Sequence, residues 1–96
     1  MKIKARIKTI YSEGSEKARA DIILDNVFVI HGVKLIDGGK GPFILLPGED
    51  RKNHEGNRKR YEYAHPLNAE TRKAFLEAVL DAYEQTNGEN LSGPAI

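Results

Sequence analysis

The fold of this chain is decided by residues 17–36, which read KARADIILDNVFVIHGVKLI. Apolar and polar residues alternate up to Leu24, and an alternation with a period of two predicts a strand with one buried face. The Asp-Asn pair at positions 25–26 then predicts a tight turn. The apolar stretch Val27–Ile36 is predicted as one bent strand or two short strands, because Gly32 is typical of a bulge or a bend.

The segments on either side of this stretch add further strands. Residues 2–10 alternate in the same way and are joined to the first strand by a polar turn at 12–16, which predicts a β-hairpin. Pro42–Pro47 is predicted as a short apolar strand between prolines, and we expect it to lie centrally on one face. Gly48–Arg60 is polar and has no period, so it is predicted as a long loop. Tyr61–Ala64 is predicted as a short edge strand.

The C-terminal part is predicted as one helix. Asn68 is a suitable N-cap, residues 69–86 carry apolar side chains at spacings of three and four, and Gly88 is typical of a helix end. The sequence therefore predicts an α+β fold, with an antiparallel sheet of four to five strands packed by one C-terminal amphipathic helix. Residues 1–87 would form a single domain, and residues 88–96 a flexible tail.

Length and composition exclude several classes of protein. The 96 residues suffice for one modest core, and pairing with a second copy would be a natural source of further stability. Cysteine is absent, which excludes disulfides and thiolate metal sites. Charges interrupt the apolar residues at the N-terminus, and no apolar run approaches membrane-spanning length, so we expect a cytoplasmic protein without a membrane partner.

The formal net charge is only +1, but the basic residues are clustered. The candidate nucleic-acid-binding residues lie in the predicted loop and at its end: Arg51, Lys52, Arg58, Lys59, Arg60 and Tyr61. Cations can bind phosphate oxygens, and a tyrosine beside them can stack on an unpaired base. The alternative is a solvated loop whose charges only keep it in water.

A second basic row, formed by Lys2, Lys4, Arg6 and Lys8, alternates along the first strand. We interpret it as protection of an edge strand against aggregation rather than as a binding site.

No catalytic or metal site is expected. His31, His54 and His65 lack the helical spacing or the neighbouring cysteines of a zinc site, and His31 and His65 are interpreted as hydrogen-bonded structural residues. Asp25 and Asp37 lie at predicted turns, where aspartate serves local hydrogen bonding. We therefore expect no enzyme, no cofactor and no small-molecule substrate.

Three blocks of the sequence, in order, resemble the stage V sporulation protein G (septation protein) family. They are Leu24–Gly38, Gly41–Pro47 and His65–Asn68, the last followed by Thr71-Arg72 and an amphipathic helix. The resemblance implies a homodimeric α+β module that binds DNA and RNA and regulates processes such as septation and sporulation.

The resemblance also bears on individual residues. In this family the basic residues after the strand-ending proline are implicated in nucleic-acid binding, and here Arg51 and Lys52 hold that position. The segment between Pro47 and His65 is longer than in the family, and Glu62 stands where the family has an aspartate. Two hypotheses follow: a nucleic-acid-binding regulator, or a protein-interaction adaptor in cell division or cell-wall regulation that does not bind nucleic acid directly.

Overall fold

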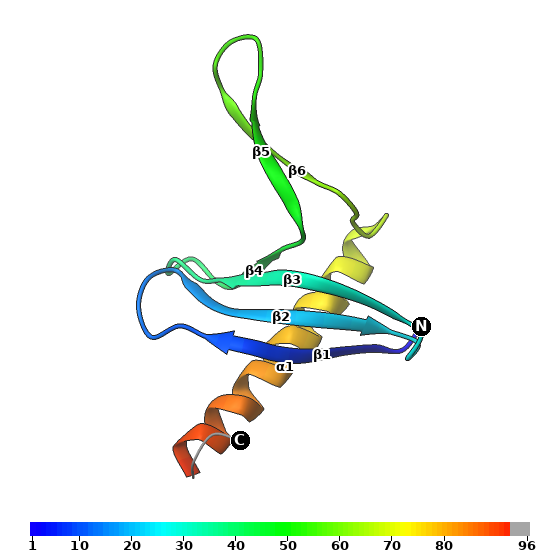
Figure 1. Ribbon diagram of the computed structural model, residues 1–96, viewed down its shortest axis with the longest axis vertical. Coiled ribbons are helices and arrows are strands. Elements are labelled where there is room, and N and C mark those ends of the chain that lie inside the picture. The colour runs from blue at the N-terminus through cyan, green and yellow to red at the C-terminus, as the bar shows by residue number, and fades with distance from the viewer. Residues whose placement is uncertain (93–96) are drawn as a thin grey trace.

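The computed structural model describes residues 1–92, and it shows a four-stranded antiparallel sheet with one long helix across one of its faces (Figure 1). In spatial order the strands are β1 (Ile3–Ile10), β2 (Glu16–Leu24), β3 (Phe28–Ile36) and β4 (Phe43–Leu45). The helix is α1 (Ala69–Ser92). The predicted α+β architecture is confirmed.

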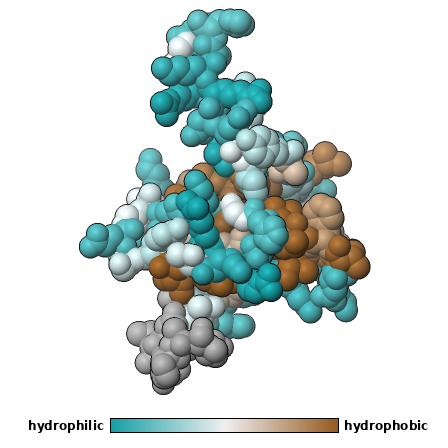
Figure 2. Space-filling view, viewed as in Figure 1, coloured by the Kyte–Doolittle hydropathy of each residue, from teal (hydrophilic) through white to brown (hydrophobic). Residues whose placement is uncertain are grey.

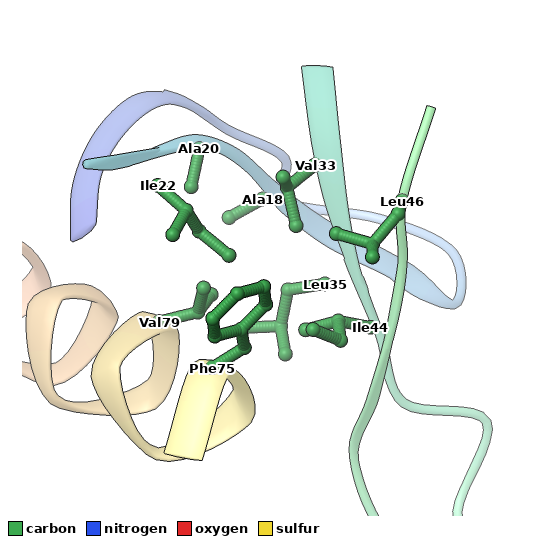
Figure 3. Packing of buried hydrophobic residues seen from close by; sticks show 9 residues of the cluster. All are labelled: Ala18, Ala20, Ile22, Val33, Leu35, Ile44, Leu46, Phe75 and Val79. Carbon is green, nitrogen blue, oxygen red and sulfur yellow. The ribbon is translucent and has the colours of Figure 1, made fainter. Parts of the chain in front are cut away.

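The core lies between this sheet and the helix (Figure 3). Its buried apolar residues come from β2, β3, β4 and the residue after it, and α1: Ala18, Ala20, Ile22, Val33, Leu35, Ile44, Leu46, Phe75 and Val79. The alternation of the strands puts these side chains on one face, and the helical spacing of Phe75 and Val79 turns both toward that face. Each large side chain buried here contributes about 1.5–3 kcal/mol.

The predicted turn between β2 and β3 is present. Asp25 and Asn26 both have positive φ, 52° and 59°, which suits the tight two-residue turns that follow the twist of a hairpin. The backbone N–H of Val27 donates to the carbonyl of Leu24 at 3.0 Å. The backbone N–H of Lys2 also donates to Oδ1 of Asp25, at 2.7 Å, and thereby ties the N-terminus to this turn.

Strand β3 is one bent strand, one of the two predicted alternatives. Gly32 has φ 75°, and the register between β2 and β3 shifts opposite it, between Ala20 and Ile22. A bulge of this kind bends a strand and increases its twist.

Asp21 departs from the predicted alternation of β2. The alternation predicts Asp21 on the exposed face of the strand, yet it is only 3% exposed. It lies on the sheet face away from the helix, where Arg6 Nη2 donates to its Oδ2 at 3.0 Å and His31 Nδ1 lies 3.1 Å from its Oδ1. Burial raises the pKa of Asp21, but the hydrogen bonds with His31 and Arg6 outweigh it and the pKa lies below its ordinary value. The hydrogen-bonded interpretation of His31 is confirmed.

The expected central position of the Pro42–Pro47 segment is wrong. Strand β4 pairs only with β3 and forms one edge of the sheet. Proline has no N–H to donate, so flanking prolines suit a strand with one free edge.

The predicted loop at Gly48–Arg60 is also wrong. Strands β5 (Gly48–Lys52) and β6 (Arg58–Glu62) form a second, two-stranded antiparallel sheet, which also replaces the edge strand expected at Tyr61–Ala64. We call this hairpin the ribbon. It projects from the body of the molecule (Figure 1). Both of its faces meet water along most of its length, so the sequence shows no apolar alternation there.

The helix begins as predicted and extends further. The backbone N–H of Thr71 donates to Oδ1 of Asn68 at 2.7 Å, which confirms the N-cap. The helix runs through Gly88 to Ser92, because glycine weakens a helix by about 1 kcal/mol relative to alanine without removing its hydrogen bonds. Of the predicted tail, residues 93–96 lie outside the described residues.

Candidate nucleic-acid interface

The ribbon brings all six candidate residues together. Its register pairs Arg51 with Lys59 and Lys52 with Arg58 directly across the two strands. Side chains alternate between the faces of a two-stranded sheet, so the first pair lies on one face and the second on the other. We call these the Arg51 face and the Lys52 face.

The Arg51 face also carries Tyr61. The guanidinium carbon of Arg51 lies 5.0 Å from the centre of the Tyr61 ring, and Nζ of Lys59 lies 5.9 Å from it. These are cation–π distances, and the ring therefore holds both cations beside each other. The Nε of Arg51 also donates to Glu49, and the Tyr63 hydroxyl approaches the same carboxylate at 3.5 Å.

The Lys52 face has two exposed cations at its outer end, next to an ordered turn. Lys52 and Arg58 are both exposed, next to the turn that joins β5 to β6. In that turn, Oδ1 of Asn53 accepts hydrogen bonds from the backbone N–H groups of Glu55 and Asn57, each at 2.9 Å. The turn therefore holds the outer ends of both strands in register.

Arg60 differs from the other candidate cations. Its Nη2 donates to the carbonyl of Leu46 at 2.7 Å, Asp50 lies 3.8 Å from its Nη1, and its side chain is 27% exposed. Its Nε is buried without a hydrogen-bond partner among the described residues. Arg60 therefore joins the base of the ribbon to the segment after β4.

Glu62 and Arg72 hold the ribbon to the helix, a pair that sequence reasoning missed. Arg72 donates to both carboxylate oxygens of Glu62, at 2.8 and 2.7 Å, and also to the carbonyl of Ile44 at 3.1 Å. The N–H of Leu46 donates to Glu62 at 2.9 Å. The hydrogen bonds from Arg72 lower the pKa of Glu62 against the opposing effect of burial. The signals in the sequence were that Glu62 stands where the family has an aspartate and that Arg72 follows the family's third block.

Glycine is required at the base of the ribbon. A Cβ on Gly48 would lie 2.7 Å from Cα of Glu62 and would also clash with the backbone carbonyl of Tyr61. The close approach of the two strands at this point therefore excludes any side chain.

The N-terminal basic row lies elsewhere. Strand β1 forms the other edge of the four-stranded sheet, as the edge-protection interpretation requires. Lys2, Lys4 and Lys8 are exposed, whereas Arg6 is engaged by Asp21. This row is not continuous with the ribbon in sequence or in strand pairing.

His65 lies beside the ribbon and borders an open cavity there. His65 Nδ1 lies 2.9 Å from the carbonyl of Pro66, so this histidine too has a hydrogen-bond partner. Within residues 1–92, no group of three or more histidine, cysteine or acidic side chains is placed to hold a metal ion. An open cavity of about 540 Å³ beside β6 is lined by residues of the ribbon and its surroundings: Leu45, Lys59, Arg60, Tyr61, Glu62, His65 and Arg72. In the described part of the chain, the helix lacks the apolar length needed to cross a membrane.

Comparison with known proteins agrees with the three sequence blocks. The profile of the SpoVG family matches residues 1–85. The "Putative septation protein SpoVG" of Clostridium novyi (strain NT) is 43% identical over 90 residues, which cover 88% of this chain and 86% of that protein. The protein of the same name from Caldicellulosiruptor bescii is 44% identical over 79 residues, which cover 82% of this chain and 85% of that protein. This chain belongs to the SpoVG family.

Proposed function

We propose that this protein is a regulator that binds DNA or RNA through the phosphate backbone, with the outer end of the ribbon as its contact surface. One observation carries the proposal: four exposed cations, Arg51, Lys52, Arg58 and Lys59, lie within two adjacent cross-strand pairs. Like charges placed directly opposite each other destabilise a sheet, so a purely structural ribbon gains nothing from this arrangement. Phosphate oxygens neutralise such charges and release counterions.

The six candidate residues take different roles in this proposal. The four exposed cations contact phosphates, and arginine can hold two phosphate oxygens at once. Tyr61 holds Arg51 and Lys59 in position. Arg60 anchors the ribbon at its base through the Leu46 carbonyl and makes no phosphate contact.

Fluorescence anisotropy with labelled random duplex DNA, single-stranded DNA and RNA, each in a salt series, tests the proposal. Wild-type protein should bind at least one pool with an affinity that falls as salt rises. The double variant Arg51→Ala/Lys52→Ala should bind more weakly, with a flatter dependence on salt. It removes one cation from each face of the ribbon.

The matched control is Lys40→Ala/Lys73→Ala. Both lysines are exposed, neither forms an ion pair among the described residues, and the change in net charge is the same. Equal affinities and slopes for the two double variants would remove the ribbon from the site. No binding to any pool at low salt would remove the nucleic-acid function.

We further propose that the protein acts in the cytoplasm as a homodimer and has no catalytic activity. The small core supports dimerisation, because a domain of this size buries a limited share of its surface. Light scattering coupled to size-exclusion chromatography should give twice the mass of the chain. A mass equal to one chain at all concentrations would contradict the dimer.

A protein-interaction adaptor in cell division or cell-wall regulation is the second candidate function. Exposed apolar side chains gather near the N-terminus, where Met1 is 70% exposed, Phe28 62% and Leu67 94% (Figure 2). They border a cavity of about 300 Å³. A pull-down from nuclease-treated lysate tests this candidate. It gains support if the wild type captures a partner protein that the Phe28→Ser variant no longer binds and that the ribbon variants still bind.

A further inference from the structure

We propose that the ribbon enters the major groove of duplex DNA and that its two faces contact the two phosphate backbones that form the walls of the groove. The inference rests on the proposed nucleic-acid binding and adds to it the form of nucleic acid and the geometry of contact. Duplex DNA is thereby preferred over single strands and over duplex RNA.

The distribution of charge on the ribbon is the first argument. The Arg51 face carries Arg51 and Lys59, and the Lys52 face carries Lys52 and Arg58, in consecutive cross-strand pairs. Cations on opposite faces of one thin sheet cannot all reach a single phosphate backbone. They can reach two backbones that lie on either side of it, and the walls of a groove provide these.

The dimensions of the ribbon agree with this placement. A two-stranded ribbon has strands about 4.8 Å apart, and face-to-face packing of sheets needs about 10 Å. The major groove of B-form DNA is about 12 Å wide and admits such a ribbon. The ribbon projects from the body, on a molecule whose extents are 51 × 33 × 21 Å, so its outer end can enter a groove while the sheet and helix stay outside (Figure 1).

Single strands fit this surface less well. Proteins that hold single strands use aromatic rings on which unpaired bases stack. The Tyr61 ring on the Arg51 face is 40% exposed, and Arg51 and Lys59 already lie at cation–π distances of 5.0 and 5.9 Å from its centre. Strands β5 and β6 therefore offer a single strand four exposed cations but only one aromatic ring, and that ring is shared with two of the cations.

Duplex RNA fits less well for a different reason. The major groove of an A-form helix is deep and narrow, and protein side chains cannot enter it to read the bases. A ribbon with cations on both faces would meet only the rim of that groove. The number of phosphates it neutralises should then be smaller than on duplex DNA.

Paired variants of the two faces test the inference. The Arg51-face variant is Arg51→Ala/Lys59→Ala, the Lys52-face variant is Lys52→Ala/Arg58→Ala, and Lys40→Ala/Lys73→Ala is the control with the same loss of charge. The probes are one duplex DNA of non-repeating sequence, each of its strands alone, and the RNA duplex of the same sequence. Circular dichroism and thermal melting confirm that each variant is folded.

We expect the tightest binding to duplex DNA and a loss of duplex affinity in both face variants. Each should lower the slope of log affinity against log salt by about 1.8, since each phosphate contact on B-form DNA contributes about 0.9. The control should leave the slope unchanged.

Two other groups of results would overturn different parts of the proposal. Equal or tighter binding to single strands or duplex RNA, or a loss confined to one face variant, overturns the groove geometry and leaves nucleic-acid binding intact. Wild-type binding that neither face variant weakens on any probe, or the absence of all binding, overturns the proposed function together with this inference.

Discussion

The Tyr61 side chain positions two cations of the ribbon before nucleic acid binds. Its ring lies on the same face of the ribbon as Arg51 and Lys59, and it holds the two cations near each other although they repel. Long basic side chains lose rotamer entropy when they bind a phosphate. A ring that already restricts them in the free protein lowers that loss, so Tyr61 acts on binding through its neighbours.

This role predicts the effects of two substitutions. Tyr61→Ala should weaken nucleic-acid affinity by about two- to five-fold, the equivalent of one exposed cation–π interaction. Tyr61→Phe keeps the ring and should bind as the wild type does. Anisotropy titrations at fixed low salt make the comparison. A loss of affinity in Tyr61→Phe as large as that in Tyr61→Ala would assign the role to the hydroxyl instead.

At the scale of elements, the ribbon is held to the body by a few directed contacts rather than by apolar packing. The bidentate pair of Glu62 with Arg72 joins β6 to α1, and Arg60 joins β6 to the carbonyl of Leu46. A two-stranded hairpin is marginally stable by itself in water. The order of the ribbon therefore depends on this polar base.

The Glu62 carboxylate should make part of the stability depend on pH. Its folded-state pKa lies below its ordinary value because Arg72 and the Leu46 N–H bind the charged form. The contribution of Glu62 to the free energy of unfolding is therefore complete above its unfolded-state pKa. It is lost as the pH falls through the folded-state pKa. Glu62→Gln should lower the free energy of unfolding near neutral pH by about 1–3 kcal/mol and should flatten its decline toward acid pH.

Urea denaturation across a pH series measures this effect. Glu84→Gln is the control, since Glu84 is exposed on α1 and forms no ion pair among the described residues. Parallel pH profiles for the wild type and Glu62→Gln would show that the pair contributes no pH-dependent stability.

On the scale of the whole molecule, one small core supports both the sheet and the helix. Phe75 and Val79 are the only helical members of the buried cluster within the described residues, and they face β2 and β3 (Figure 3). Phe75→Ala should lower the free energy of unfolding by about 3–5 kcal/mol, out of the roughly 5–15 kcal/mol typical of a domain. Urea denaturation followed by circular dichroism measures the loss.

Leu67→Ala provides the matched control for this prediction. Because that leucine is 94% exposed, its substitution should leave the midpoint of the urea denaturation curve unchanged. A loss below about 1 kcal/mol in Phe75→Ala would mean that the helix contributes little to the core. Sheet and helix should also unfold in one transition, since neither has another apolar partner among residues 1–92.

Patterns that depend on neighbouring residues in the chain could be predicted from the sequence. The alternation in β1, the turn at Asp25 and Asn26, the N-cap at Asn68 and the helical spacing of Phe75 and Val79 correspond to the structure. The alternation in β2 corresponds to it except at Asp21, which is buried. Each is a local rule, in which the residue type and its neighbours suffice. The six candidate residues were also identified by type, as a cluster of cations beside a tyrosine.

The sequence by itself determined that this chain has strands β1 to β4, a helix that packs on their sheet and a concentration of cations between Pro47 and His65. Only the tertiary structure decided that those cations form a ribbon with two charged faces, because a hairpin solvated on both faces leaves no apolar period to detect. It also decided that Arg60 turns to the Leu46 carbonyl, and that Glu62 pairs with Arg72 from a distant helix. Such contacts depend on where separate segments meet in space, which no local pattern in the sequence records.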